Sequence, residues 1–133
     1  KDKFLILDLL TWMHQKKVDY TNTFCHLMNF EIRNKEVFKD NNFENWKKRW
    51  QERLKINNNT PKKYLNLMRN VNPIVIPRNH KVEEALDEAN KNNIEPFNKL
   101  LEVLNNPYSE QKNIEEYQIP SVTNTKYQTF CGT

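Results

Sequence analysis

The chain has 133 residues, of which 29% are charged and 37% hydrophobic, and its formal net charge is +4. This length and apolar content allow one domain with a buried core, and we expect a single helical domain over residues 1–133. No apolar run approaches the roughly 20 residues of a membrane-spanning helix, and Asp8 interrupts the first apolar stretch where a secretory signal would be continuous. We therefore expect a cytoplasmic protein with no membrane partner. Lys1 leads directly into an amphipathic pattern, so we also expect a fragment of a longer protein.

The only glycine of the sequence is Gly132. Phosphate-binding loops of the P-loop, Rossmann and kinase kinds need glycine where the backbone approaches phosphate. We therefore predict that none of these loops can be built here and that the chain is not a self-contained nucleotide-binding enzyme of a familiar type. The two cysteines, Cys25 and Cys131, are interpreted as reduced thiols. Together with three scattered histidines they offer no zinc-ligand spacing, and we predict no metal site and no cofactor in this fragment.

Four helices are predicted in the first half of the chain, where apolar residues recur at three- and four-residue spacing. They cover residues 2–17, 21–28, 43–56 and the segment after Thr60, with one further turn near 35–38. Thr21, Asn42 and Thr60 are the predicted N-caps, because their side-chain oxygens can accept hydrogen bonds from first-turn N–H groups. Pro61 then takes the first helical position, where its missing N–H costs little.

The predicted helix over residues 43–56 combines an aromatic stripe with a basic run at 47–49. Basic residues beside tryptophans are typical of surfaces that bind nucleic acid. Trp46 and Trp50, however, are four residues apart and share a face with Phe43, which indicates a core-facing stripe. The basic residues then project from the solvated face.

Charge is distributed unevenly along the chain. Residues 1–71 contain 15 Lys and Arg against 8 Asp and Glu, whereas residues 72–133 contain 6 against 9. A basic half can dock on an acidic partner or on nucleic acid. One hypothesis for the function is therefore an autonomous basic helical module that binds nucleic acid or protein. We keep it as the alternative to the hypothesis developed below, and nucleic acid is not the partner we favour.

The second half is predicted to contain two more helices and a tail. In residues 81–92, Val82, Leu86 and Ala89 share one face and the carboxylates lie opposite, so we predict that these carboxylates face water. Asn93 is the predicted cap of the helix over 94–105, whose inner face is assigned to Phe97, Leu100, Leu101 and Leu104. Periodicity stops at Pro107, which predicts an extended tail over 107–133. The predicted fold class is all-α, an irregular bundle of about five to six helices.

The most distinctive motifs lie between Met68 and Gln111, in MRNVNPIVIPRNHKVEEALDEANKNNIEPFNKLLEVLNNPYSEQ. This stretch resembles the C-terminal region of the selenoprotein O (YdiU) proteins, where NPxxxxRN and an acidic, alanine-containing helix precede LLEVLxNPY. The segments LLTWMHQKKVDYTNTFCHL and FENWKKRWQERL also fit family segments, and the ending FCGT is similar to the family's C-terminal Cys followed by two small residues. The resemblance covers essentially the whole chain.

The resemblance implies a longer parent protein with a kinase-like catalytic domain. Such proteins transfer AMP from ATP to Ser, Thr or Tyr hydroxyls of protein substrates and use a divalent metal, Mg or Mn. Their nucleotide loop, catalytic Asp and metal ligands match no position here, so the fragment alone is expected to be inactive. Its expected partner is the N-terminal kinase-like domain of the same protein.

Five residues carry over from the family pattern. Asn72, Pro73, Arg78 and Asn79 form NPxxxxRN, to which we assign a structural or interdomain role, and Cys131 matches the terminal redox residue. An accessible terminal thiol can reach a partner cysteine that a core thiol such as Cys25 cannot.

The NPxxxxRN motif also predicts local structure. Asn72 is expected to end one helix and cap the next, with Pro73 at the first position, so that Arg78 can reach the body of the protein. Pro77 departs from the family pattern, which usually has a non-proline apolar residue at this position. In a helix that starts at Pro73, Pro77 would be the fifth residue and would remove a backbone donor. This departure favours a later helix start, near Pro77.

Overall fold

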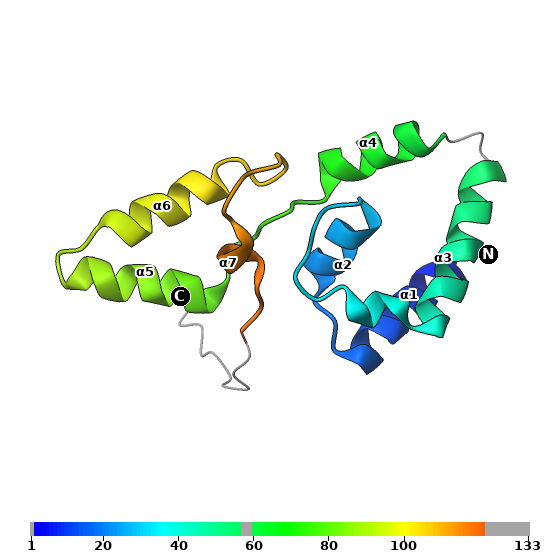
Figure 1. Cartoon of the computed structure of the whole chain (residues 1–133), viewed down its shortest axis with the longest axis horizontal. Helices are drawn as coiled ribbons and strands as arrows, with labels where there is room; N and C mark the ends of the chain where they lie inside the picture. Colours follow the sequence, from blue (N-terminus) through cyan, green and yellow to red (C-terminus); the bar gives the residue numbers. More distant parts are fainter. Residues whose placement is uncertain (1, 57–59, 122–133) are drawn as a thin grey trace, which may run out of the picture. The chain divides into compact units, whose positions relative to one another are not determined.

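The structure is a computed structural model that describes residues 2–56 and 60–121 (Figure 1). Within these residues, seven α-helices and a 3-10 turn account for the regular structure and no strand occurs, which confirms the all-α prediction. The elements are α1 (Asp2–Lys16), α2 (Tyr20–Leu27), η1 (Glu36–Lys39), α3 (Asn41–Ile56), α4 (Pro61–Val71), α5 (Asn79–Asn90), α6 (Glu95–Leu104) and α7 (Glu115–Gln118). None of the helices in the described ranges is long and apolar enough to cross a bilayer.

The chain divides into two compact units. The first comprises residues up to 74 together with 108–110, and the second comprises residues 75–107 and those from 111 onward. Whether the two units form one domain is not decided by this division, and the single domain over 1–133 stays a prediction.

Aspartates cap α2 and α3, in place of the residues predicted from the sequence. Asp19 accepts a hydrogen bond from the N–H of Asn22 at 2.9 Å, and α2 begins directly after it. The predicted N-cap Thr21 lies inside the first turn, so that prediction was wrong. Asp40 accepts from the N–H of Asn42 at 3.1 Å, so Asn42 is also not the cap. Both aspartates add a negative charge near the positive end of the helix dipole.

The predicted start of α4 is confirmed. The side-chain oxygen of Thr60 accepts from the N–H of Lys63 at 3.3 Å, and Pro61 follows as the first helical residue. The fixed backbone angle of proline suits this position, and its missing N–H would have had no partner within the helix. The start of α4 is therefore set by local chemistry alone.

The core of the first unit is an aromatic cluster where α1, α2, η1 and α3 meet. Its buried members are Leu9, Trp12, Met13, Leu27, Phe38, Phe43 and Trp46. The ring centroid of Phe43 lies 4.6 Å from that of Trp12 and 5.7 Å from that of Trp46. Trp50 stacks on Trp46 and packs against the cluster as a partly buried residue. The prediction of a core-facing aromatic stripe on α3 is thereby confirmed.

Asp40 ties the end of α1 to the start of α3. Its carboxylate accepts a hydrogen bond from Trp12 Nε1 at 2.9 Å and lies 2.7 Å from Lys16 Nζ. The hydrogen bond with Lys16 and then that with Trp12 lower the pKa of Asp40 to about 2. The ionised carboxylate is thus stabilised in the folded state.

Replacing Asp40 with asparagine is expected to lower the thermal midpoint near neutral pH, because the ion pair with Lys16 is lost while a capping oxygen remains. The folded-state pKa is about 2 and the unfolded carboxyl titrates near ~3.9. The charge therefore stabilises the fold above about pH 4, and this stabilisation is lost as the pH falls toward 2. Circular dichroism melts across this pH range should show the difference between the thermal midpoints of the parent and Asp40→Asn becoming smaller as the pH falls.

The control for this series is Glu52→Gln, which removes an exposed carboxylate from the same α3. Its midpoint should follow that of the parent at every pH, because surface charges of this kind contribute little. A gap for Asp40→Asn that does not change with pH would assign the effect to cap geometry and contradict the role of the charge.

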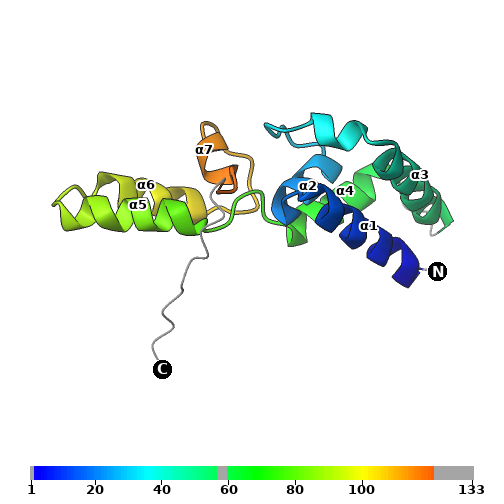
Figure 2. The ribbon, with the colours of Figure 1, turned by 90° about the horizontal axis from the view of Figure 1, so that it is seen from below.

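The second unit is built on a hairpin of α5 and α6, which lie side by side (Figure 2). Ala85 of α5 and Val103 of α6 are buried, whereas Leu86 and Leu101 are exposed. The predicted inner faces were therefore wrong at both leucines. The small side chain of Ala85 occupies the buried face, which a periodicity count that weights leucine does not anticipate. Asn93, the predicted cap of α6, instead donates to the Glu88 carboxylate at 3.1 Å.

Candidate functional site

Asn72 closes α4 but does not open α5. Its backbone N–H and its side-chain Nδ2 both donate to the carbonyl of Met68, at 2.9 and 2.8 Å. The prediction that Asn72 ends one helix is confirmed. The prediction that it caps the next, with Pro73 at the first position, is wrong, because α5 begins at Asn79. Two prolines in the connection explain the delay, since Pro77 lacks the N–H that a continuous helix would need.

The apolar residues of this connection are anchors. Ile74 is buried in the first unit, and its carbonyl accepts a hydrogen bond from Cys25 Sγ at 3.8 Å. Cys25 is itself completely buried on α2, which confirms that it packs against its neighbours. A disulfide with a distant thiol would require this part of the first unit to open. Cys131, the redox candidate, lies outside the described residues.

Arg78 connects the start of α5 with α7. It occupies the N-cap position of α5, and its Nη2 donates to the carbonyl of Gln118 at 3.1 Å. Asn79 follows as the exposed first residue of the helix. The motif residues therefore serve different units: Asn72 and Pro73 belong to the first, and Arg78 and Asn79 to the second. Their interdomain role stays a prediction.

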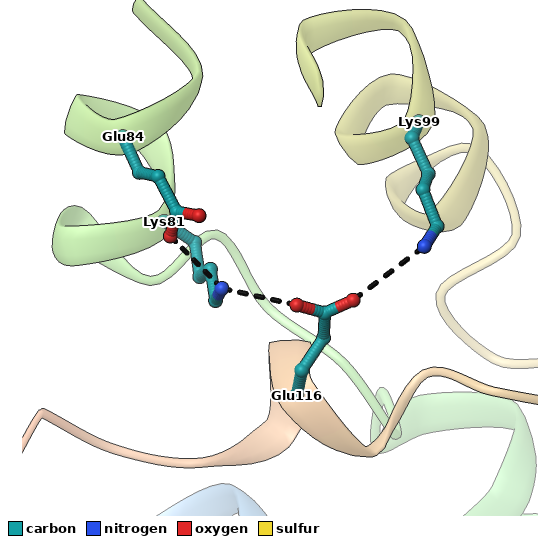
Figure 3. Close-up of polar contacts among 4 residues, drawn as sticks. All are labelled: Lys81, Glu84, Lys99 and Glu116. Atoms are coloured by element: carbon teal, nitrogen blue, oxygen red, sulfur yellow. Dashed lines mark hydrogen bonds and ion pairs between the residues drawn. The ribbon is translucent and has the colours of Figure 1, made fainter. Parts of the chain in front are cut away.

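A polar cluster attaches α7 to the α5–α6 hairpin (Figure 3). One carboxylate oxygen of Glu116 lies 3.1 Å from Lys81 Nζ on α5, and the other lies 3.5 Å from Lys99 Nζ on α6. Lys81 also contacts Glu84 at 2.9 Å. Both ammonium groups lie within 6 Å of the centroid of the Tyr117 ring. We call these five residues the α7 clip.

The charges of the α7 clip stabilise one another. The hydrogen bond to Glu84, opposed by partial burial and helped by Glu116, raises the pKa of Lys81. The hydrogen bond from Lys81 is the main cause that lowers the pKa of Glu116. Lys81 and Glu116 are therefore held in their charged forms, and the clip acts as a structural fastening. Both shifts move the pKa away from neutrality, whereas a general acid or base works best with a pKa near the operating pH.

Sequence reasoning missed the α7 clip. The three-residue spacing of Lys81 and Glu84 is a local signal of a helical ion pair. The pairing of Lys81 with Glu116 joins residues 35 positions apart, and no local pattern indicates it. In the sequence, Tyr117 is only one of several apolar residues in a segment without periodicity, and nothing marks it as a core residue.

The first unit also contains an apolar groove with a volume of about 420 Å³. All four of its long helices contribute, with Leu10 of α1, Tyr20 of α2, Trp50 of α3 and Leu67 of α4 among the lining residues. Among the lining residues, Asn72 is the one with a carboxamide side chain, and the others are aliphatic, aromatic or methionine. Such a surface suits a nonpolar occupant, because it has few groups that could hold a polar ligand.

The basic residues of α3 are partly engaged by α1. Arg49 lies 2.7 Å from the carboxylate of Asp8, and Arg53 forms a two-pronged contact with Asp2 at 2.6 and 2.9 Å. Trp46 is buried and donates from Nε1 to a backbone carbonyl of α1. A single-stranded nucleic-acid surface needs exposed aromatic rings beside free cations. This arrangement therefore does not favour the nucleic-acid alternative.

Across residues 2–56 and 60–121, no three His, Cys, Asp or Glu side chains gather where they could hold a metal ion. The surfaces that stand out are thus the apolar groove and the α7 clip. Both are suited to packing and to holding helices together.

Comparison with known proteins identifies the wider family. The model of the family described as "Protein adenylyltransferase SelO" matches residues 1–105. The chain is 50% identical over its full length to "Protein nucleotidyltransferase YdiU" of Pelagibacter ubique, and 44% identical over 99% of its length to the protein of that name in Clostridium perfringens strain 13. These alignments cover 28% and 27% of the two relatives. The chain therefore belongs to the SelO family of protein adenylyltransferases and corresponds to a minor part of its relatives' length.

Proposed function

We propose that residues 1–133 form the C-terminal helical region of a protein adenylyltransferase and support its kinase-like catalytic domain. The observation that carries this proposal is the family match over residues 1–105, combined with alignments that cover little more than a quarter of each relative. In the whole protein, a Ser, Thr or Tyr hydroxyl of a protein substrate attacks the α-phosphorus of ATP. AMP is transferred to that oxygen and pyrophosphate leaves.

ATP and its Mg or Mn ion are held outside residues 1–133 in this proposal. Two observations support the assignment. The chain has one glycine, at position 132, so it lacks the material for a phosphate-binding loop. The described residues also provide no cluster of metal ligands. The contribution of this region is then to the stability and geometry of the catalytic domain, on which the precise placement of reacting groups depends.

Cys131 is proposed to add redox control. Its thiol pairs with a cysteine in the catalytic part, and the two electrons and two protons released pass to a small-molecule disulfide, which is reduced to two thiols. The complete burial of Cys25 supports this choice of cysteine, because Cys25 cannot meet an external thiol while the first unit is folded.

The test compares AMP transfer by three forms of the full-length protein: the parent, a form truncated before this region, and Cys131→Ser. Transfer from ATP labelled at the α-phosphate to a general protein acceptor measures the activity. We expect truncation to abolish transfer or destabilise the protein, and we expect oxidised glutathione to change the activity of the parent alone. Full activity after truncation would overturn the supporting role. Equal responses of the parent and Cys131→Ser to oxidant would overturn the redox role only.

A further inference from the structure

Helix α4 is amphipathic, yet it has no buried residue. Leu67 is 57% exposed and Val71 is 71% exposed on its surface. Side chains at its edges fasten it to the first unit: the rings of Trp50 and Tyr64 meet at 5.5 Å, and Arg69 donates to the carbonyl of Met28 at 3.2 Å. A helix of 11 residues gains most of its stability from packing of its apolar face, and that packing is incomplete here.

The incomplete packing of α4 coincides with the apolar groove. Leu67 of α4 and Leu10 of α1 both line the groove, and Leu10 is 42% exposed. Leaving such side chains partly in water forgoes part of the favourable free energy of burying them. Contiguous apolar surface of this kind usually marks an interaction site in a folded protein. The groove therefore has the character of a protein interface that a partner segment would cover.

The fraction of each relative's length that the chain covers indicates which partner segment would cover the groove. With 28% of the Pelagibacter protein aligned, the remaining 72% of such a polypeptide would be covalently attached to this region. A tethered segment meets its site at an effective concentration that is typically millimolar, which favours it over a second copy. Residues 1–71 carry 15 Lys and Arg against 8 Asp and Glu, so a segment with acidic flanks is complementary in charge.

We propose that an apolar, acid-flanked segment of the same polypeptide, outside residues 1–133, docks in the groove between α1 and α4. This inference rests on the proposed function, and it specifies the surface through which the helical region supports the catalytic domain. In the assembled protein, the groove-facing positions of α1 and α4 become buried. Apolar positions on the other faces of the same two helices stay exposed.

The test uses matched cysteines in the full-length protein with Cys131→Ser as background. Leu10→Cys and Leu67→Cys probe the groove, while Leu7→Cys and Val71→Cys are controls on the same helices that do not line it. Leu7 and Leu10 are 45% and 42% exposed here, so an uncovered groove would give them similar labelling rates. Maleimide modification at each position is followed by peptide mass spectrometry.

We expect both groove positions to label roughly tenfold or more slowly than their controls, because labelling then requires the contact to open. Protection that disappears on dilution would assign the groove to a second copy and overturn the proposal. Equal rates at groove and control positions would overturn it as well. Activity is read separately: a protected groove in a protein that remains active after truncation of this region would leave the docking intact and remove the supporting role.

Discussion

Replacing Phe43 with alanine is expected to lower the free energy of unfolding of the first unit by about 3–5 kcal/mol. The side chain is completely buried, and rings from three other elements surround it, with centroids at 4.6 Å for Trp12, 5.0 Å for Phe38 and 5.8 Å for His26. Removing the ring loses its transfer free energy and leaves a cavity that rigid aromatic neighbours cannot fill. The loss is comparable with the total stability of many small domains.

Urea unfolding followed by tryptophan fluorescence measures this loss directly, because Trp12 and Trp46 belong to the same cluster. Phe4→Ala is the matched control, since Phe4 is the same residue type on α1 but is exposed. Its effect should stay within about 0.5 kcal/mol. A loss below about 1 kcal/mol for Phe43→Ala would contradict the view that the aromatic cluster is the main source of stability in this unit.

The elements of the first unit could be predicted from sequence because their signals are local. The helical spacing of apolar residues placed α1 to within one residue of its observed end. The same spacing assigned Phe43 and Trp46 to the core, and both are buried. Thr60 and Pro61 marked the start of α4 without any tertiary information.

The errors arose where two local solutions compete. Both Asp19 and Thr21 are good N-caps, and the backbone conformation that decides between them is not visible in the sequence. In α5, the turn of the hairpin places Ala85 inward, although Leu86 is the more hydrophobic of the two. Choosing between adjacent helical faces requires knowledge of the partner helix, which a periodicity count does not contain.

The apolar groove and the α7 clip depend on contacts between residues that are distant in the sequence. The groove brings Leu10 and Leu67, which are far apart in the sequence, to one surface. The family resemblance found the motif residues Asn72 and Arg78, but the resemblance does not state what they touch. Their partners, Met68 and Gln118, are known only from the fold.

Replacing Tyr117 with alanine is expected to detach α7 from the hairpin, at a cost of about 3 kcal/mol by analogy with other buried aromatic truncations. With only four residues, α7 cannot be stable by itself, so tertiary contacts must hold it. Tyr117 is buried, and Lys81 and Lys99 lie over its ring. Removing the ring eliminates the packing and both cation–π contacts together. Hydrogen exchange of the amides of α7, resolved by mass spectrometry, should then accelerate while α5 and α6 keep their protection.

Two further variants separate the causes. Tyr117→Phe keeps the ring and should leave the exchange of α7 nearly unchanged. Glu116→Gln removes the charge that pairs with Lys81 and Lys99, and since the Glu116 side chain is about half exposed, its cost should stay below about 1 kcal/mol. If Glu116→Gln loosened α7 as much as Tyr117→Ala, charge and not burial would hold the helix.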